Sequence, residues 1–243
     1  MSEPLLRCEG LTKTFGGLRA VDGVDFELRA GEVRGLVGPN GSGKSTTINL
    51  LSGHLPMDSG TIAIEGTRIE RLAPHKISGL GLARTYQIPR PFSTLTVHEN
   101  VRVAAHFGAT DSRPDDIDAE ADRWVEFVGL APVAGLLPDT ITLHQRKLLE
   151  LARALATRPR VLFLDEVLAG LNPRELVEGI ELVHRIKGLG ISIVVVEHIM
   201  RVILDLCDHL TVLNFGKVIA QGQPEECLRD DDVVTAYLGG HHA

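Results

Sequence analysis

The fold of this chain is decided by the stretch Gly38-Pro39-Asn40-Gly41-Ser42-Gly43-Lys44-Ser45-Thr46. From Gly38 to Ser45 it matches the phosphate-loop pattern in full, with a glycine, four residues, and then Gly-Lys and a hydroxyl side chain. Glycines let successive backbone N–H groups turn inward and cradle phosphate oxygens. Lys44 supplies a positive charge for the β- and γ-phosphates, and the Ser45 hydroxyl is suited to ligate magnesium. The stretch therefore predicts a nucleotide site.

The residues on either side of the loop support this prediction. Val33 to Val37 is an apolar run of strand length, and Thr46 to Leu51 has the character of a helix start. A helix that follows the loop presents the positive end of its dipole to the same anion. The alternative is a chance glycine turn, and a strand before the loop with a helix after it argues against that alternative.

Two acidic residues follow a second apolar strand. Val161 to Leu164 is a strand candidate that ends in Asp165 and Glu166. In an open parallel sheet, ligands bind beyond the carboxyl ends of the strands. Asp165 is therefore placed to hold magnesium near the loop, and Glu166 to orient and deprotonate an attacking water. The alternative, an acidic pair that caps the next helix, is outweighed by the complete phosphate loop upstream.

The last third of the chain predicts a parallel sheet. The apolar runs Val161 to Leu164 and Ile191 to Val196 are separated by helical spacing from Pro173 to Leu189. Strand, helix and strand in this order form a βαβ unit, whose two strands are parallel. Further strands are expected nearer the ends of the chain, at Val24 to Leu28, Thr61 to Ile64, Thr211 to Leu213 and Lys217 to Ala220.

Residues 89–158 differ from the rest because strand patterns give way to helical ones. Helical spacing covers Leu95 to Phe107, Ile117 to Val128 and Leu143 to Ala156. We therefore expect a single domain, residues 1–243. Its α/β core is formed by about 1–88 and 159–243, and a helical subdomain is inserted at about 89–158.

Composition excludes several classes of function. The 243 residues carry a net charge of -7, whereas a protein that binds nucleic acid usually presents a basic face. Cys8, Cys207 and Cys227 are far apart, so neither a disulfide framework nor a zinc site is expected. No window approaches 18 uninterrupted apolar residues, so work at a membrane would require docking on a protein that spans it.

In order along the chain, these motifs resemble those of ABC transporter nucleotide-binding subunits, from about Leu5 to Leu238. The resemblance implies a P-loop NTPase core of the ABC ATPase type, with an N-terminal antiparallel β subdomain and an inserted helical subdomain. It implies that the ligands of the loop residues Gly38 to Thr46 are ATP and Mg²⁺. Phe15, in Lys13-Thr14-Phe15-Gly16, matches an aromatic residue that stacks on adenine. Gln87, in Arg84-Thr85-Tyr86-Gln87, matches a glutamine that ligates magnesium and touches the membrane partner.

The same resemblance gives roles to three strand-end residues. Asp165 and Glu166 match the magnesium aspartate and the catalytic glutamate. His198 follows the apolar strand Ile193 to Val196. Taken alone it is best interpreted as a surface histidine, but it matches the switch histidine, which donates to the γ-phosphate. Ala169-Gly170-Leu171-Asn172 matches the loop that contacts the opposite subunit.

A finer resemblance concerns the first of the two ATPases in branched-chain amino acid importers. It rests on Arg84 to Phe92, on Ala169-Gly170-Leu171-Asn172-Pro173 and on Ala236-Tyr237-Leu238-Gly239. It implies a second ATPase, permease subunits and, indirectly, an external solute-binding protein as partners. Importers of urea or short amides share these features and remain an alternative. The chain would then work as a peripheral protein at the cytoplasmic side of the cell membrane.

One stretch departs from the family pattern. The signature motif, Leu-Ser-Gly-Gly-Gln or a close variant, is expected where this chain has Ile141-Thr142-Leu143-His144-Gln145. In the family this motif closes over the γ-phosphate bound by the partner subunit. Thr142 keeps the hydroxyl and Gln145 the amide, but His144 replaces the last glycine. A side chain at a position of close backbone approach is expected to hinder closure, or to supply a different donor.

Three other classes fit the sequence less well. A soluble ABC ATPase of DNA repair or translation usually has two cassettes or long coiled-coil arms, and this chain has one cassette and no sustained heptads. A GTPase would carry Asn-Lys-x-Asp, which does not occur. A module that binds nucleotide without hydrolysing it would not be expected to retain both Glu166 and His198. We therefore predict an ATPase that drives transport.

Overall fold

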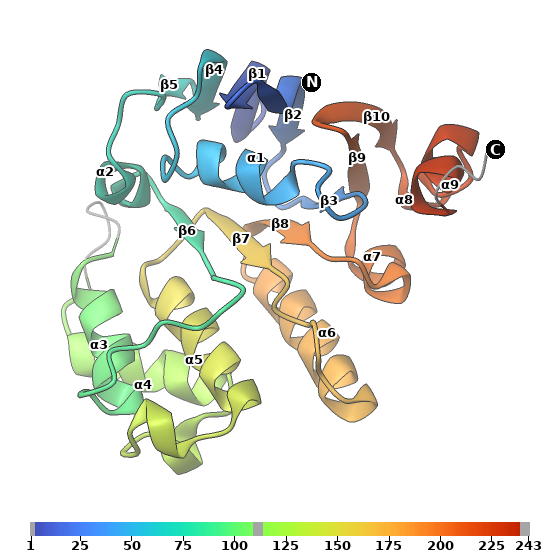
Figure 1. Cartoon of the computed structure of the whole chain (residues 1–243). Helices are drawn as coiled ribbons and strands as arrows, with labels where there is room; N and C mark the ends of the chain where they lie inside the picture. Colours follow the sequence, from blue (N-terminus) through green and yellow to red (C-terminus); the bar gives the residue numbers. More distant parts are fainter. Residues whose placement is uncertain (1–2, 109–113, 239–243) are drawn as a thin grey trace.

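The structure is a computed structural model and describes residues 3–108 and 114–238. Gly239, at the end of the quoted stretch Ala236–Gly239, lies outside these residues. Figure 1 shows two sheets stacked with helix α1 between them, and a group of helices beyond the larger sheet. The larger sheet has the strand order β10-β9-β3-β8-β7-β6. Its strands are β3 Val33–Val37, β6 Leu82–Arg84, β7 Val161–Asp165, β8 Ser192–Val196, β9 His209–Asn214 and β10 Lys217–Gly222.

The pairing in the larger sheet confirms the βαβ prediction. Strands β9, β3, β8, β7 and β6 pair in parallel, and β10 pairs with β9 in the antiparallel sense. The crossover between β7 and β8 is helix α6, Pro173–Gly188. Since β3 is paired between β8 and β9, the loop that follows Val37 emerges at the same edge as Asp165 and Val196, where β7 and β8 end.

The smaller sheet is antiparallel and forms the N-terminal part of the chain. Its order is β2-β1-β4-β5, with β1 Leu6–Phe15, β2 Leu18–Leu28, β4 Ser59–Ile64 and β5 Thr67–Arg68. The sequence pattern predicted only the second half of β2 and most of β4. Strand β1 escaped notice because glycine and polar residues interrupt its alternation, and register shifts mark the irregular positions.

The central strands β3, β7 and β8 of the larger sheet are buried on both faces, and each face belongs to a different core. In β7, Val161 and Phe163 pack with α1 and the smaller sheet, whereas Leu162 and Leu164 pack with the helices of the other layer. Such strands read as continuous apolar runs, which is why they were visible in the sequence. Strand β3, which leads into the phosphate loop, is packed in the same way between the two cores.

The helices between residues 97 and 156 lie beyond the larger sheet (Figure 1). The three main ones are α3 Val97–His106, α4 Ile117–Phe127 and α5 Leu143–Ala156, joined by the short turns η2 Ala131–Val133 and η3 Pro138–Thr140. They agree closely with the ranges that helical spacing predicted. The remaining helices are α1 Lys44–Leu51, α2 Pro74–Gly79, α7 Met200–Leu206, α8 Pro224–Cys227 and α9 Asp231–Leu238.

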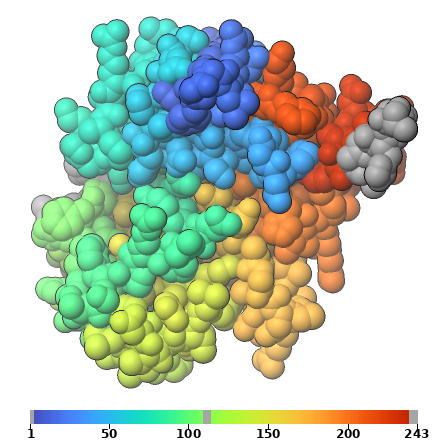
Figure 2. Space-filling view, viewed as in Figure 1, coloured from blue at the N-terminus to red at the C-terminus, as the bar shows by residue number. Residues whose placement is uncertain are grey.

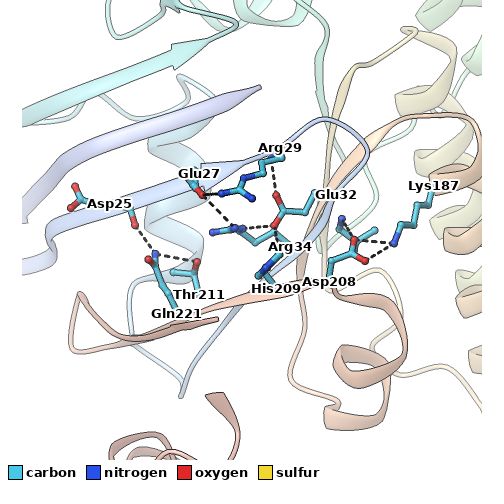
Figure 3. A network of polar contacts seen from close by, with 11 residues as sticks. Asp25, Glu27, Arg29, Glu32, Arg34, Lys187, Asp208, His209, Thr211 and Gln221 are labelled. Carbon is cyan, nitrogen blue, oxygen red and sulfur yellow. Dashed lines mark hydrogen bonds and ion pairs between the residues drawn. The ribbon is translucent and has the colours of Figure 1, made fainter. Parts of the chain in front are cut away.

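A polar network ties the larger and smaller sheets together at the opposite edge, where β3 and β9 begin (Figure 3). The buried Arg34 donates through Nε to Glu32 Oε1 at 2.8 Å, and Glu32 Oε2 accepts the Arg29 backbone N–H at 2.7 Å. Asp208 accepts from Lys187 and from the Val33 backbone N–H. The buried charges are thus paired and hydrogen-bonded, as burial requires.

Within residues 3–108 and 114–238, no helix has the length and apolar character to cross a bilayer.

Candidate functional site

The phosphate loop needs its glycines because other backbone segments pass very close to it. Gly38 has φ +148°, and a Cβ at this position would lie 2.1 Å from the carbonyl oxygen of Leu213. Gly43 has φ +108°, and its Cβ would lie 2.5 Å from the carbonyl oxygen of Ala20. Side chains cannot occupy such positions. The loop is therefore fixed by β2 and β9 on its two sides.

Helix α1 begins at Lys44, two residues earlier than the sequence pattern predicted. Its N-cap is Gly43, which has no side chain to bond the first free N–H groups of the helix. Those groups are consequently available to an anion, which is the arrangement expected of a phosphate site. Asn40, Gly41 and Ser45 are exposed, whereas Ser42 is buried and its Oγ has no hydrogen-bond partner among the described residues.

Figure 2 shows the region of the loop and α1, in light blue, at the surface of the molecule between the N-terminal strands and the helical part. Pro39 and Thr46 are half-buried at its two ends. The backbone N–H of Gly216, in the turn after β9, donates to Ser42 O at 2.9 Å. The loop is thus bonded on one side to the turn after β9, and its exposed residues face solvent on the other side.

Lys44 folds back over the loop. Its Nζ donates to the backbone carbonyls of Gly38 and Pro39, each at 2.8 Å. Burial lowers the pKa of Lys44, and the charges of Glu166 and Asp165 oppose that shift. The ammonium group therefore lies close to the predicted acidic pair. Phosphate oxygens can replace the two carbonyls as its partners.

Asp165 is held by an arginine that the sequence pattern did not single out. Arg84, at the end of β6, donates through Nη2 to Asp165 Oδ2 at 2.8 Å, and through Nη1 to Asn49 Oδ1 at 2.5 Å. Both ionic side chains are less than a tenth exposed. Arg84 therefore bridges the strand end to α1 and orients the carboxylate. In the sequence, the only indication that Arg84 belongs to the site was its position three residues before Gln87.

Glu166 adopts a left-handed backbone conformation, with φ +51°. Its backbone N–H donates to Val196 O at 2.9 Å, which ties it to the end of β8. Its side-chain Oε2 accepts from Gln87 Nε2 at 2.5 Å. The structure thus brings Gln87, which follows β6, into direct contact with the predicted catalytic carboxylate.

The oxygen donors at this edge suit magnesium. Ser45 offers a hydroxyl, Gln87 an amide oxygen and Asp165 a carboxylate, which are the hard ligands that Mg²⁺ takes together with phosphate oxygens. Arg84 bonds Oδ2 of Asp165 and leaves Oδ1 for another partner. The residues present therefore fit a magnesium ion brought with a nucleotide.

His198 and Glu197 stand where β8 ends. His198 is exposed, and its Nδ1 lies 4.0 Å from Glu197 Oε2. Glu197 is buried, and burial raises its pKa.

Phe15, the predicted adenine-stacking residue, ends β1 and is 47% exposed, with Lys13 Nζ 5.7 Å from its ring centre. Its open ring face is available for stacking.

The signature stretch is organised as a helix cap. Thr142 Oγ1 accepts the backbone N–H of Gln145 at 3.2 Å, and Gln145 Oε1 accepts the backbone N–H of Thr142 at 2.9 Å. This reciprocal pair starts α5. No hydrogen bond or ion pair between described residues joins Thr142, His144 or Gln145 to the phosphate loop. Among the described residues, the side-chain hydrogen bonds of Thr142 and Gln145 stay within the start of α5.

His144 lines a pocket of about 270 Å³ between α4, α5 and α6. Its neighbours in the lining include Leu148, Gly179 and Leu182. Its Nδ1 is buried and has no hydrogen-bond partner in the described part of the chain. Sequence reasoning did not foresee that this ring nitrogen is buried.

Comparison with known proteins agrees with this geometry. The family described as ABC transporter matches residues 21–169. The high-affinity branched-chain amino acid transport ATP-binding protein BraF of Pseudomonas aeruginosa is 37% identical, with 98% of this chain and 99% of BraF covered. LivG of Salmonella typhimurium, described in the same words, is 37% identical with the same coverage. The probable LivG of Archaeoglobus fulgidus is 36% identical, with 97% and 95% covered.

Solved structures show the same fold. A nucleotide-free ATP-binding cassette from an ABC transporter has a TM-score of 0.87 at 31% identity, with 98% of this chain and 100% of that chain covered. The ADP conformation of an ATP-binding cassette has a TM-score of 0.85 at 30% identity, with the same coverage. With the phosphate loop and the strand-end acids in place, the chain belongs to the ABC transporter family, as one of its ATP-binding and ATP-hydrolysing subunits.

Proposed function

We propose that this chain powers an importer of branched-chain or other hydrophobic amino acids. The observation that carries the proposal is the near full-length identity of 36–37% with BraF and LivG proteins. The chain would work as a peripheral subunit on the cytoplasmic side of the membrane, with permease subunits and a second ATPase as direct partners. An external solute-binding protein would act on the permeases.

Lys44 and the backbone N–H groups of the phosphate loop would bind the β- and γ-phosphates, and Phe15 would stack on adenine. Ser45, Asp165 and Gln87 would hold Mg²⁺, which when bound neutralises phosphate charge as the terminal bond breaks. These roles are supported by the hydrogen bonds of Lys44 and by the open carboxylate oxygen of Asp165.

Glu166 would accept a proton from the attacking water, and His198 would donate a hydrogen bond to the γ-phosphate. The contact between Gln87 and Glu166 supports a further step. A permease that moves Gln87 would release the carboxylate for its work as a base. The helical subdomain that bears the signature, about residues 89–158, would complete the site on the partner ATPase through Thr142, His144 and Gln145.

The proposal is tested by reconstitution with the partner ATPase and the permeases in vesicles. The isolated chain has half of each composite site, so it should hydrolyse ATP slowly, and turnover should rise when the partners are added. Glu166→Gln should keep ATP binding and stop turnover at this site. High turnover by an isolated monomer at every concentration would contradict the shared-site mechanism.

Solute identity needs a separate measurement in the same vesicles. ATP-dependent uptake of leucine, isoleucine or valine supports the proposal. Uptake of urea or a short amide, without uptake of these amino acids, would assign the chain to the alternative importer class.

A further inference from the structure

Two charged side chains hold the segment directly after Glu166, residues 167–169. Lys147, on α5, donates through Nζ to Ala169 O at 2.5 Å and to Val167 O at 3.3 Å. Glu197, after β8, accepts the backbone N–H of Leu168 through Oε1 at 3.0 Å. Polar backbone groups of three successive residues are therefore bonded by one cation and one carboxylate from two different elements.

Glu197 is buried at this segment and Lys147 is half-buried. Glu197 is 2% exposed, and its second oxygen, Oε2, has no hydrogen-bond partner within the described residues. Burial lowers the pKa of Lys147, while the charges of Glu197 and Glu166 raise it. A buried charge persists in a fold only where its partners compensate it. The charge of Glu197 favours the protonated form of Lys147, and each of the two side chains also bonds a backbone group of the segment.

A third element closes the arrangement. The side chain of Leu168 is buried against Gly179 of α6, where a Cβ would lie 2.5 Å from Leu168 Cδ2. Residues 167–169 are thus fixed from α5, from the end of β8 and from α6. Glu166 precedes them and is in the left-handed region, so its orientation depends on a fixed continuation of the chain.

We propose that Lys147 and Glu197 are positioning residues for ATP hydrolysis. Together they fix residues 167–169 and thereby the carboxylate of Glu166. Lys147 lies one and a half turns after the signature residue Thr142, so the contact also couples the position of α5 to Glu166. Glu197 is adjacent to His198 and couples the same segment to it. The inference rests on the proposed roles of Glu166 and His198.

The test uses the chain assembled with permeases and with a partner ATPase whose own hydrolytic site has been silenced, so that turnover reports this chain's site alone, and it measures kcat and KM for ATP. Lys147→Met and Glu197→Leu should each lower kcat by about tenfold or more, because a small displacement of a catalytic group is costly in rate. The KM for ATP should stay near the parental value, because the phosphate loop is untouched. Lys147→Arg, which keeps a donor, should recover most of the rate.

Matched controls separate positioning from stability. Lys187→Met removes a lysine that pairs with Asp208, and Glu32→Gln alters a buried glutamate that accepts a backbone N–H. Neither control residue bonds residues 167–169, so these variants should lower Tm without lowering kcat. If a test variant loses Tm as the controls do and keeps the parental kcat, the proposal is overturned. A raised KM with unchanged kcat overturns it as well.

The double variant Lys147→Met/Glu197→Leu tests whether the two residues act on one segment. A loss of kcat clearly smaller than the product of the single losses supports a shared segment, and a full product overturns it. Glu166→Gln is measured in parallel. If it abolishes turnover while Lys147→Met has no effect, only this inference fails. If it leaves turnover intact, the proposed role of Glu166 fails first.

Discussion

The phosphate loop and the signature stretch both lead into a helix, yet they are built in opposite ways. The phosphate loop enters α1 through Gly43, which leaves the first N–H groups of the helix unbonded by any side chain. The signature stretch enters α5 through a reciprocal cap in which Thr142 and Gln145 bond each other. The first N–H groups of α1 are therefore available to an anion, whereas a side chain at the start of α5 already bonds one of the first N–H groups of that helix.

This difference separates what one chain does alone from what it does in a pair. Lys44, Asp165, Glu166 and Gln87 already contact or influence one another. The signature residues make no hydrogen bond with them in the described part of the chain, and in the proposed mechanism they meet a phosphate on another subunit. The following predictions test that division, from the largest expected effect to the smallest.

Lys44→Ala should abolish measurable ATP binding, because the phosphates lose the one flexible cation of the loop. Binding is measured by titration calorimetry. Lys76→Ala, on α2, removes a lysine of similar charge outside the loop and should bind as the parent does. Parental affinity in Lys44→Ala would mean that the loop does not hold the phosphates.

Gly38→Ala should destabilise the fold by about 3 kcal/mol, because its Cβ would lie 2.1 Å from Leu213 O in a segment with no room to yield. Urea unfolding measures the change. Gly188→Ala is the control, since no atom lies within 4 Å of its Cβ and α6 favours alanine there. Equal stability of the two variants would show that the loop is not constrained by β9.

Phe15→Ala should weaken the binding of ATP and of GTP alike, by about 1–3 kcal/mol, because stacking tolerates any purine. Competition titrations with both nucleotides give the two losses. Phe107→Ala removes a more exposed ring elsewhere and should change neither affinity. A loss confined to ATP would indicate hydrogen-bond recognition of adenine instead.

Thr142→Ala should destabilise the chain by about 1 kcal/mol through loss of the helix cap. ATP binding by the chain's own phosphate loop should be unchanged, which calorimetry on the isolated chain can show. Thr96→Ala removes the equivalent cap of α3 and is the control, which should lose a similar amount of stability and also leave ATP binding unchanged. Weaker binding in Thr142→Ala alone would mean that the two regions communicate within one chain.

His144→Gly has the smallest expected effect, a modest rise in turnover at the partner's site. Glycine would let the backbone approach the phosphate, while the ring now seated between α5 and α6 makes no polar contact that the described residues reveal. The variant is measured in the full complex with this chain's Glu166→Gln, so that one site is silent. A fall in turnover would identify His144 as a ligand.

Sequence patterns predicted the parts of the fold and site that depend on local structure. The phosphate loop, β7 with Asp165 and Glu166, and α5 each have a continuous pattern that a reader can see. Arg84 was not predicted as a partner of Asp165, because β6 has three residues and shows no alternation. The contact of Lys147 with Ala169 joins a helix to a loop 22 residues away, and no periodicity encodes such pairs.

The pairing of Arg84 with Asp165 has a consequence for how nucleotide arrives. Lys44 and Arg84 contribute two positive charges at this edge, and Asp165 and Glu166 contribute two negative ones, so the four sum to zero before any ligand enters. The whole chain carries -7 and would repel an anionic nucleotide from afar. Long-range steering therefore gives ATP no help, and capture depends on Lys44 and backbone N–H groups that act at close range. Salt that screens the distant repulsion should leave the association rate unchanged or slightly faster, the reverse of what a basic binding surface would show.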